Sequence, residues 1–191
     1  MPDLLPEHPG VLEGHGIRLE PMSVGHAAAL LAASDTLQFQ FMPTTPTWTE
    51  SGFEEYIRER TSGGSYAWVC VLDGEVVGES TIFDVSLAHR HLEVGHTWIT
   101  ESCRGTRVNP AMKLLMLTYA FETFGAVRVQ LKCDARNMRS RNAIVKLGAS
   151  FEGILRNHMI LPSGELRQTA FHSILDSEWP AVKAGLLARL D

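Results

Sequence analysis

A predicted strand and the most regular predicted helix of the chain are joined by Cys103-Arg104-Gly105-Thr106-Arg107-Val108-Asn109-Pro110. From Pro110 to Phe124 apolar residues recur at helical spacing, with Asn109 as the expected N-cap and Gly125 just past the end. A helix start presents free backbone N–H groups, and its dipole favours a negative charge there. The segment therefore suits a phosphate or pyrophosphate, which its two arginines would also contact; a surface turn with solvated arginines is the alternative.

Strands are predicted on both sides of this segment, where apolar and polar side chains alternate or apolar residues cluster. Upstream, Ala67–Leu72 and Glu75–Gly78 flank Asp73-Gly74, a pair that supplies the positive φ angles of a two-residue hairpin turn. The other strands are expected at Ile17–Glu20, Leu92–Ile99, Val127–Cys133, Ile154–Leu161 and Leu166–Leu175, the last two joined by a Pro162-Ser163-Gly164 turn.

Helices are predicted between several of these strands. Ser23 is expected to cap a helix through Ala33, Thr49 to cap one that ends at Gly63-Gly64, and Met138–Leu147 to form a third before a short C-terminal helix. Antiparallel strands followed by a β-α-β crossover predict an α/β (α+β) fold, with a mixed sheet and helices on both faces. We expect one domain over residues 1–191, in which residues 1–13 form an extended lead.

The composition excludes several classes of protein. Apolar residues make up 45% of the 191 residues and charged residues 20%, so the chain is expected to build a packed core. A formal net charge of −5 argues against nucleic-acid or anionic-membrane partners. The longest apolar run, Ala27–Ala33, is too short for a membrane helix, and the N-terminus lacks signal-peptide features. A soluble, cytoplasmic protein is expected.

Cysteine and histidine usage gives no indication of a metal site. The cysteines are Cys70, Cys103 and Cys133, an odd number set mostly among apolar neighbours, which favours reduced thiols over disulfides. His89 and His91 have no second cluster at ligand spacing, so no metal is expected. The sequence also lacks a nucleophile elbow, a Walker loop and a full dinucleotide-binding fingerprint, which disfavours hydrolases, P-loop NTPases and dehydrogenases of those types.

A second polar segment, Asp134–Asn142, follows the strand Val127–Cys133. Asn137 is placed to cap the next helix, and Ser140, one turn later, carries a hydroxyl toward the same end of the sheet. Simple helix capping beside a solvated arginine cluster is the alternative to a functional role.

Taken in order, these segments resemble the GNAT acetyltransferases, and more closely their RimJ/RimL-like branch, whose members acetylate ribosomal-protein N-termini and other amines. The resemblance covers about Gly14 to Leu175, and the order and spacing of its landmarks are specific. The landmarks are the Asp73-Gly74 hairpin, the strand Glu93-Val94-Gly95-His96-Thr97-Trp98-Ile99, the arginine-glycine loop, Asn137-Met138-Arg139-Ser140 and Lys146-Leu147-Gly148-Ala149-Ser150-Phe151-Glu152-Gly153.

The resemblance implies acetyl-CoA as cosubstrate, held in a V-shaped opening between splayed strands of a mostly antiparallel sheet. The family's pyrophosphate loop has the pattern Gln/Arg-x-x-Gly-x-Gly/Ala; Arg104 matches its start, whereas Arg107 and Asn109 replace the later small residues. A side chain at the Arg107 position would come close to the phosphates. The residues implied in cofactor binding are Trp98, Ile99, Thr100, Arg104, Gly105, Thr106, Arg107, Val108, Asn109 and Asn137.

The reaction implied is direct attack of a neutral amine on the thioester. Backbone N–H groups would stabilise the oxyanion, and Ser140 would protonate the leaving sulfur. Glu93 and His158 are candidates for the base, each with an ordinary polar role as the alternative.

Two classes of function remain open on the sequence. The first is an acetyl-CoA-dependent N-acetyltransferase that acts on a primary amine, either a peptide N-terminus such as that of a ribosomal protein or a small molecule. The second is a non-catalytic module of the same fold that senses CoA or another ligand, an alternative that the Arg107 departure favours. The loops at Pro43–Trp48 and 162–166 are expected to shape the acceptor site. The closing hairpin would offer a strand for a homodimer.

Overall fold

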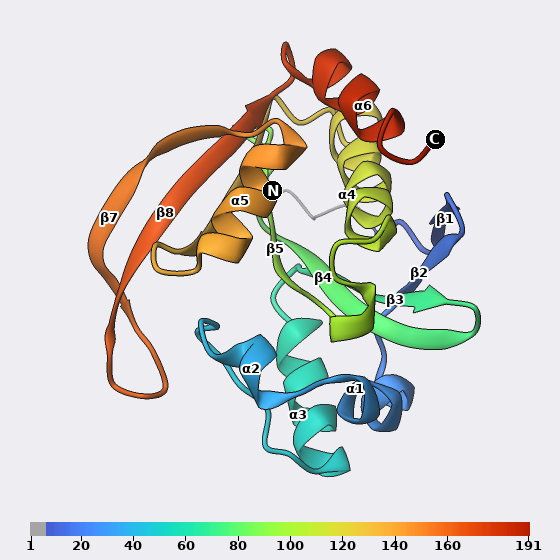
Figure 1. The fold of residues 1–191 in the computed structure, drawn as a ribbon, viewed down its shortest axis with the longest axis vertical. Coiled ribbons are helices and arrows are strands. Elements are labelled where there is room, and N and C mark those ends of the chain that lie inside the picture. Colours follow the sequence, from blue (N-terminus) through green and yellow to red (C-terminus); the bar gives the residue numbers. More distant parts are fainter. Residues whose placement is uncertain (1–6) are drawn as a thin grey trace.

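Eight strands form one sheet in the computed structural model, which describes residues 7–191 (Figure 1). The order is β1-β2-β3-β4-β5-β6-β8-β7, and neighbours are antiparallel except for β5 and β6. The expectation of a mixed, mostly antiparallel sheet flanked by helices is confirmed. The strands are β1 (Leu12–Gly14), β2 (Ile17–Pro21), β3 (Tyr66–Leu72), β4 (Glu75–Ser86), β5 (His91–Ile99), β6 (Arg128–Asp134), β7 (Ser150–Ile160) and β8 (Leu166–Leu175).

Helices cover both faces of the sheet. Figure 1 shows α4, α5 and α6 grouped at one side and α1, α2 and α3 at the other. The helices are η1 (Val24–His26), α1 (Ala27–Ala33), α2 (Thr36–Phe39), α3 (Glu50–Arg60), η2 (Glu101–Cys103), α4 (Val108–Thr118), the π-helical η3 (Tyr119–Thr123), α5 (Met138–Leu147) and α6 (Trp179–Leu187). We call the two faces of the sheet the α4 face and the α3 face.

Local sequence determines several of these elements as predicted. Asp73 and Gly74 have φ angles of 50° and 84°, both positive as a two-residue turn of this type requires, so the β3–β4 hairpin is confirmed. The crossover from β5 through α4 to the parallel strand β6 is confirmed as well. Gly125, with φ 75°, ends the helical segment before β6.

The start of α4 differs from the prediction. Asn109 is not the N-cap; the helix begins at Val108, and the cap position belongs to Arg107, whose side chain makes no capping bond. The Val108 N–H instead donates to Thr106 Oγ1 at 3.3 Å. A proline is tolerated throughout the first turn, where N–H groups lack partners in the helix, so Pro110 did not mark the first residue.

Other boundaries also differ from the prediction. The helix expected after Ser23 is divided into η1 and α1, and the short helix α2 was not predicted. Strand β1 lies at the end of the expected lead 1–13, whose first six residues fall outside the described part. Strands β4 and β7 are longer than expected, because a bulge lets a strand continue past residues that break its alternation.

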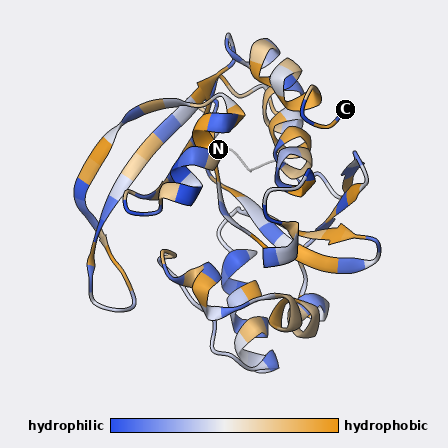
Figure 2. Cartoon of the chain, viewed as in Figure 1, coloured by the Kyte–Doolittle hydropathy of each residue, from blue (hydrophilic) through white to orange (hydrophobic). Residues whose placement is uncertain are grey.

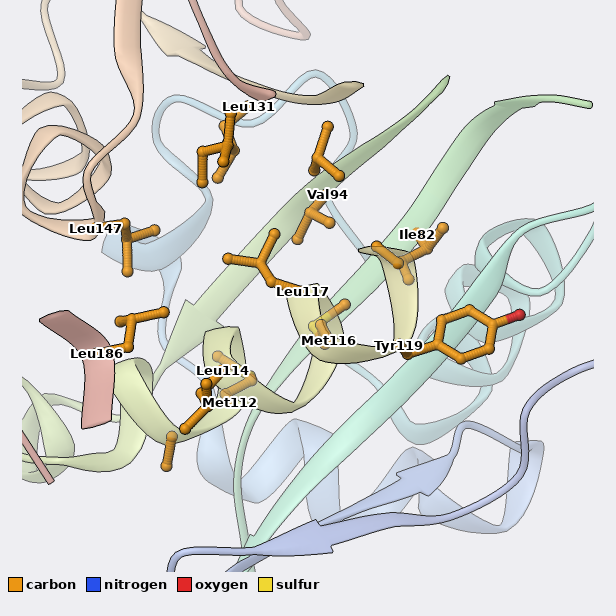
Figure 3. Packing of buried hydrophobic residues seen from close by; sticks show 14 of the residues in the cluster. Ile82, Val94, Met112, Leu114, Met116, Leu117, Tyr119, Leu131, Leu147 and Leu186 are labelled. Atoms are coloured by element: carbon orange, nitrogen blue, oxygen red, sulfur yellow. The ribbon is translucent and has the colours of Figure 1, made fainter. Parts of the chain in front are cut away.

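Two apolar cores hold the layers together. The larger lies on the α4 face, where buried side chains of α4 meet those of β4, β5 and β6, as Figure 3 shows for Ile82, Val94 and Leu117. The smaller packs α1 and α3 against the other face, around Phe53 and Trp98. Cys70, Cys103 and Cys133 are buried and unpaired, as predicted for reduced thiols. No helix within residues 7–191 has the length and apolar character to span a membrane.

Strand β7 lies at the edge of the sheet, and the β7–β8 hairpin extends beyond the other strands (Figure 1). Apolar residues along it, visible in Figure 2, include the exposed Phe151, Ile154 and Leu155. An edge strand with exposed apolar side chains suits pairing with another chain. The homodimer stays a prediction.

Candidate functional site

The parallel strands β5 and β6 separate after a short paired stretch. Three residue pairs join them: His91–Arg128, Leu92–Val129 and Glu93–Gln130. Beyond these pairs β5 continues to Ile99 and β6 to Asp134 without pairing to each other. The facing backbone edges therefore have N–H and C=O groups free of strand partners, which water or a ligand must satisfy.

A cavity of about 270 Å³ occupies the opening between the two strands. Its walls are residues 94–99 of β5, residues 131–134 of β6, the first turns of α4 and α5, and the segment after α2. Its charged lining consists of two acidic side chains, Glu93 and Asp134, and five basic ones, Arg104, Lys113, Lys132, Arg139 and Arg167. In a chain of net charge −5, the cavity is thus a local region of positive potential, suited to an anionic ligand.

A β-bulge bends β5 where it leaves β6. Ser80 of β4 faces two residues of β5, His96 and Thr97, because Glu79 pairs with Trp98 while Thr81 pairs with Gly95. His96 has a φ angle of 48°, in the left-handed region. Bulges redirect side chains and end pairing, and this one turns His96 into the cavity wall.

Below the bulge, Lys113 of α4 is buried in the α4 face and lines the cavity. Its Nζ donates to Thr97 Oγ1 at 2.6 Å and to Ser80 Oγ at 3.0 Å, two neutral hydroxyls. No carboxylate of residues 7–191 lies within ion-pair distance of Nζ. Burial without a countercharge lowers the pKa of Lys113 to about 7.

The loop before α4 presents three N–H groups toward which a ligand can approach. The N–H groups of Arg104, Thr106 and Val108 are used within the chain, by Glu101 O, Cys103 O and Thr106 Oγ1. Those of Gly105, Arg107 and Asn109 donate to no described residue. Gly105 has φ 78° and open space around its Cα, so backbone and ligand can come close together there. Alternate free N–H groups beside a helix N-terminus form an anion site.

The Arg107 side chain points away from this loop's open side. Its guanidinium lies against the β1–β2 turn, since a Cβ placed on Gly16 would be 2.9 Å from Arg107 Nη2. Arg107 is also not among the residues that line the cavity. The departure from the family pattern therefore leaves the loop's backbone accessible.

At the start of α5, Asn137 caps the helix as predicted. Its Oδ1 accepts the Ser140 N–H at 3.0 Å, and both residues line the cavity. The Cys133 thiol of β6 lies beside Ser140, and burial raises its pKa, so it is a protonated neighbour rather than a nucleophile. A hydroxyl donor thus stands at the mouth of the opening.

On the α3 face, Glu93 is buried where the strands part. Lys132 Nζ lies 2.8 Å from its Oε2, and Gln130 Nε2 donates to the same oxygen at 2.8 Å, so neither contact uses Oε1. Burial raises the pKa of Glu93, partly opposed by Lys132. One carboxylate oxygen therefore stays available on the cavity wall.

The structure brings most of the predicted site residues together. Those lining the cavity are Ser140, Glu93, Trp98, Ile99, Arg104, Gly105, Asn109 and Asn137. Thr106 and Val108 do not line it. The same holds for Thr100, whose N–H and carbonyl bond to Val77 and Cys103. His158 lies outside it on β7, 3.1 Å from Thr169 Oγ1.

Several lining residues were missed on the sequence. Lys113 interrupts the apolar stripe of its helix between Met112 and Leu114, a visible signal that we did not use. Arg167 gives the opposite of a signal, because the adjacent Leu166 is exposed while Arg167 is 4% exposed. The bulge at His96 has no proline or glycine at the bulged position to mark it.

Comparison with known proteins bears on the same region. A family model described as "Acetyltransferase (GNAT) domain" matches residues 17–150. A Bacillus subtilis (strain 168) protein with the provisional name ribosomal N-acetyltransferase YdaF is 27% identical over 111 residues, which are 58% of this chain and 60% of that protein. The chain thus aligns with less than two thirds of that relative.

Solved structures share the whole fold. A GCN5-related N-acetyltransferase from Brucella melitensis has a TM-score of 0.91 and 30% identity, covering 98% of this chain and 88% of its own. A provisionally named acetyltransferase from T. thermophilus gives 0.91 and 36%, covering 96% and 98%. Mycobacterium smegmatis RimJ, solved in complex with CoA-disulfide, gives 0.82 and 22%, covering 97% of each chain.

Replacing Lys113 by Met is expected to stabilise the protein below pH 7. Because the pKa of Lys113 falls from 10.5 to about 7 on folding, the unfolded state binds more protons between these values, and stability rises with pH across that window. The variant loses this dependence and gains about 2 kcal/mol at pH 6, since Ser80 and Thr97 still bond to each other at 2.7 Å. Denaturant unfolding from pH 6 to 10 measures it.

The exposed Lys146→Met is the matched control and should leave the pH profile unchanged. A Lys113→Met variant that is less stable than wild type at every pH would show that the ammonium group stabilises the fold.

Proposed function

Since the chain belongs to the GNAT acetyltransferases, we propose that it transfers the acetyl group of acetyl-CoA to a primary amine. The acceptor is a peptide N-terminus or a small molecule. The observation that carries this proposal is the separation of β5 and β6, which leaves a cavity with unpaired backbone on both walls and free N–H groups at one end.

The described residues fit the cosubstrate. The N–H groups of Gly105, Arg107 and Asn109 and the guanidinium of Arg104 would hold its diphosphate, at the N-terminus of α4. Backbone groups of Trp98 and Ile99 would pair with its pantetheine arm, as a strand partner does. The similarly folded RimJ was solved with CoA-disulfide, which supports this assignment. When bound, acetyl-CoA supplies a thioester for the amine to attack.

Residues from both faces of the sheet would share the chemistry. Ser140, on the α4 face, would donate its hydroxyl proton to the leaving sulfur. Glu93, on the α3 face, has Oε1 free to accept the proton from the amine, directly or through water. His158 lies outside the cavity, so we assign the base to Glu93. Backbone N–H groups of the separated β5 edge would stabilise the oxyanion.

The acceptor site would extend from the cavity toward the β7–β8 turn. A neighbouring hollow of about 210 Å³ shares Met42 with the cavity and is lined by Trp48 together with residues 161–163. These are the two loops expected to shape acceptor choice. Its apolar side chains suit a residue that follows an N-terminal amine, and ribosomal N-acetyltransferase is the provisional name of the B. subtilis relative.

Coenzyme A binding should distinguish Arg104 from Arg107. Arg104→Ala removes a cation from the cavity wall and is expected to weaken binding about tenfold. Arg107→Ala keeps the backbone N–H and removes a side chain that lies against Gly16, so it should change the dissociation constant less than twofold. Isothermal titration calorimetry measures both. Stronger binding by Arg107→Ala would mean that its side chain obstructs the loop.

The transfer itself is tested by thiol release from acetyl-CoA with a panel of peptides, amino acids and polyamines. Wild type should release thiol with at least one class. Ser140→Ala should lower kcat by about 10² with an unchanged cofactor dissociation constant, because it removes a proton donor and no binding group. The exposed Ser177→Ala is the control. Cofactor binding without thiol release on any acceptor would favour the non-catalytic sensor.

A further inference from the structure

Arg167 of β8 is a buried cation whose role is not explained by the fold. It is 4% exposed and lines the cavity. Within residues 7–191 its guanidinium makes one hydrogen bond, from Nη1 to Phe41 O at 3.3 Å, and its buried Nε has no partner. Buried polar groups are almost always paired, so this guanidinium has unused donors.

The neighbouring carboxylates are engaged elsewhere. Asp134 accepts from Arg136 Nε at 3.0 Å and Nη2 at 2.9 Å. Glu93 is held by Lys132 and Gln130. No carboxylate of the described chain lies within ion-pair distance of Arg167. An arginine cannot discharge by losing its proton, so its charge stays uncompensated until a ligand brings an anion.

Strand register places Arg167 on the acceptor side of the sheet. Cys133 pairs with Ala170 on the α4 face, so Thr169, and with it Arg167 two residues away, belong to the α3 face. Lys132 pairs with Phe171 on that same face, where Lys132 contacts Glu93. Arg167 and the proposed base therefore face one compartment, opposite the helix start proposed for the diphosphate.

Building on the proposed acetyl transfer, we infer that Arg167 binds a carboxylate of the acceptor. The amine acceptor is accordingly an amino acid, which carries the carboxylate beside its amine, or a peptide whose first residue is acidic. The amine would lie toward Glu93 Oε1 and the carboxylate toward the Arg167 guanidinium, whose fork matches two carboxylate oxygens. The positive charges of Lys132 and Arg167 would also favour the uncharged amine that attacks.

Acceptor pairs that differ only in the carboxylate test this inference on the wild-type enzyme. One arm compares free amino acids with their C-terminal amides. The other compares amidated peptides that begin with Asp or Glu with those that begin with Asn or Gln. In one arm kcat/KM should be at least tenfold higher for the acid than for the amide, and the responding arm identifies the source of the carboxylate. Equal kcat/KM in both arms would overturn the inference.

Variants of Arg167 locate the preference. Arg167→Gln should reduce the acid-to-amide ratio to within twofold while kcat/KM for the neutral acceptor and the coenzyme A dissociation constant stay within threefold. Arg167→Lys, which keeps the charge, should retain part of the ratio. The exposed Arg156→Gln is the matched control. Equal losses for acid and amide in Arg167→Gln would instead assign Arg167 to holding the segment at Phe41.

A binding measurement separates this inference from the proposed function. Calorimetric titration of the wild-type coenzyme A complex with N-acetylated acids and their amides requires no turnover. Preferential binding of the acids supports Arg167 as the carboxylate site even if no acetyl transfer is detected. Equal binding of acids and amides overturns it even if transfer is fast.

Discussion

The separation of β5 from β6 is the constraint on which the rest of this structure depends. Parallel strands in one sheet normally satisfy each other's backbone, yet here pairing ends at Glu93 and Gln130. The bulge at His96 bends β5, and α4 and α5 begin at the open end. The fold thus maintains unpaired N–H and C=O groups on two walls, an arrangement that a ligand with its own amide groups satisfies.

Charge is distributed to suit such a ligand at both ends of the opening. The chain is acidic overall, but basic side chains dominate the cavity, with Arg104 near the α4 start and Arg167 on the opposite face. Burying cations without partners costs stability, as the lowered pKa of Lys113 illustrates. A stable fold retains such groups where binding or chemistry compensates for the cost.

Elements with a local cause were predictable, whereas long-range placements were not. The Asp73-Gly74 hairpin, the long helix up to Gly125 and the Asn137 cap follow from turn chemistry and periodicity over a few residues. The family resemblance added the opening between the strands. The burial of Arg167 beside the exposed Leu166 depends on Phe41, which is 126 positions away, so no local pattern indicates it. The start of α4 was misplaced because Pro110 is compatible with several positions in the first turn.

Amide hydrogen exchange with and without coenzyme A tests the central claim most directly, because it reports on the unpaired backbone itself. The account predicts that the cofactor slows exchange at Trp98 and Ile99 on β5 and at Gly105, Arg107 and Asn109 before α4, while the β7–β8 hairpin is unaffected. Unchanged exchange at these amides in a cofactor-saturated sample, or protection confined to another face of the sheet, would contradict it.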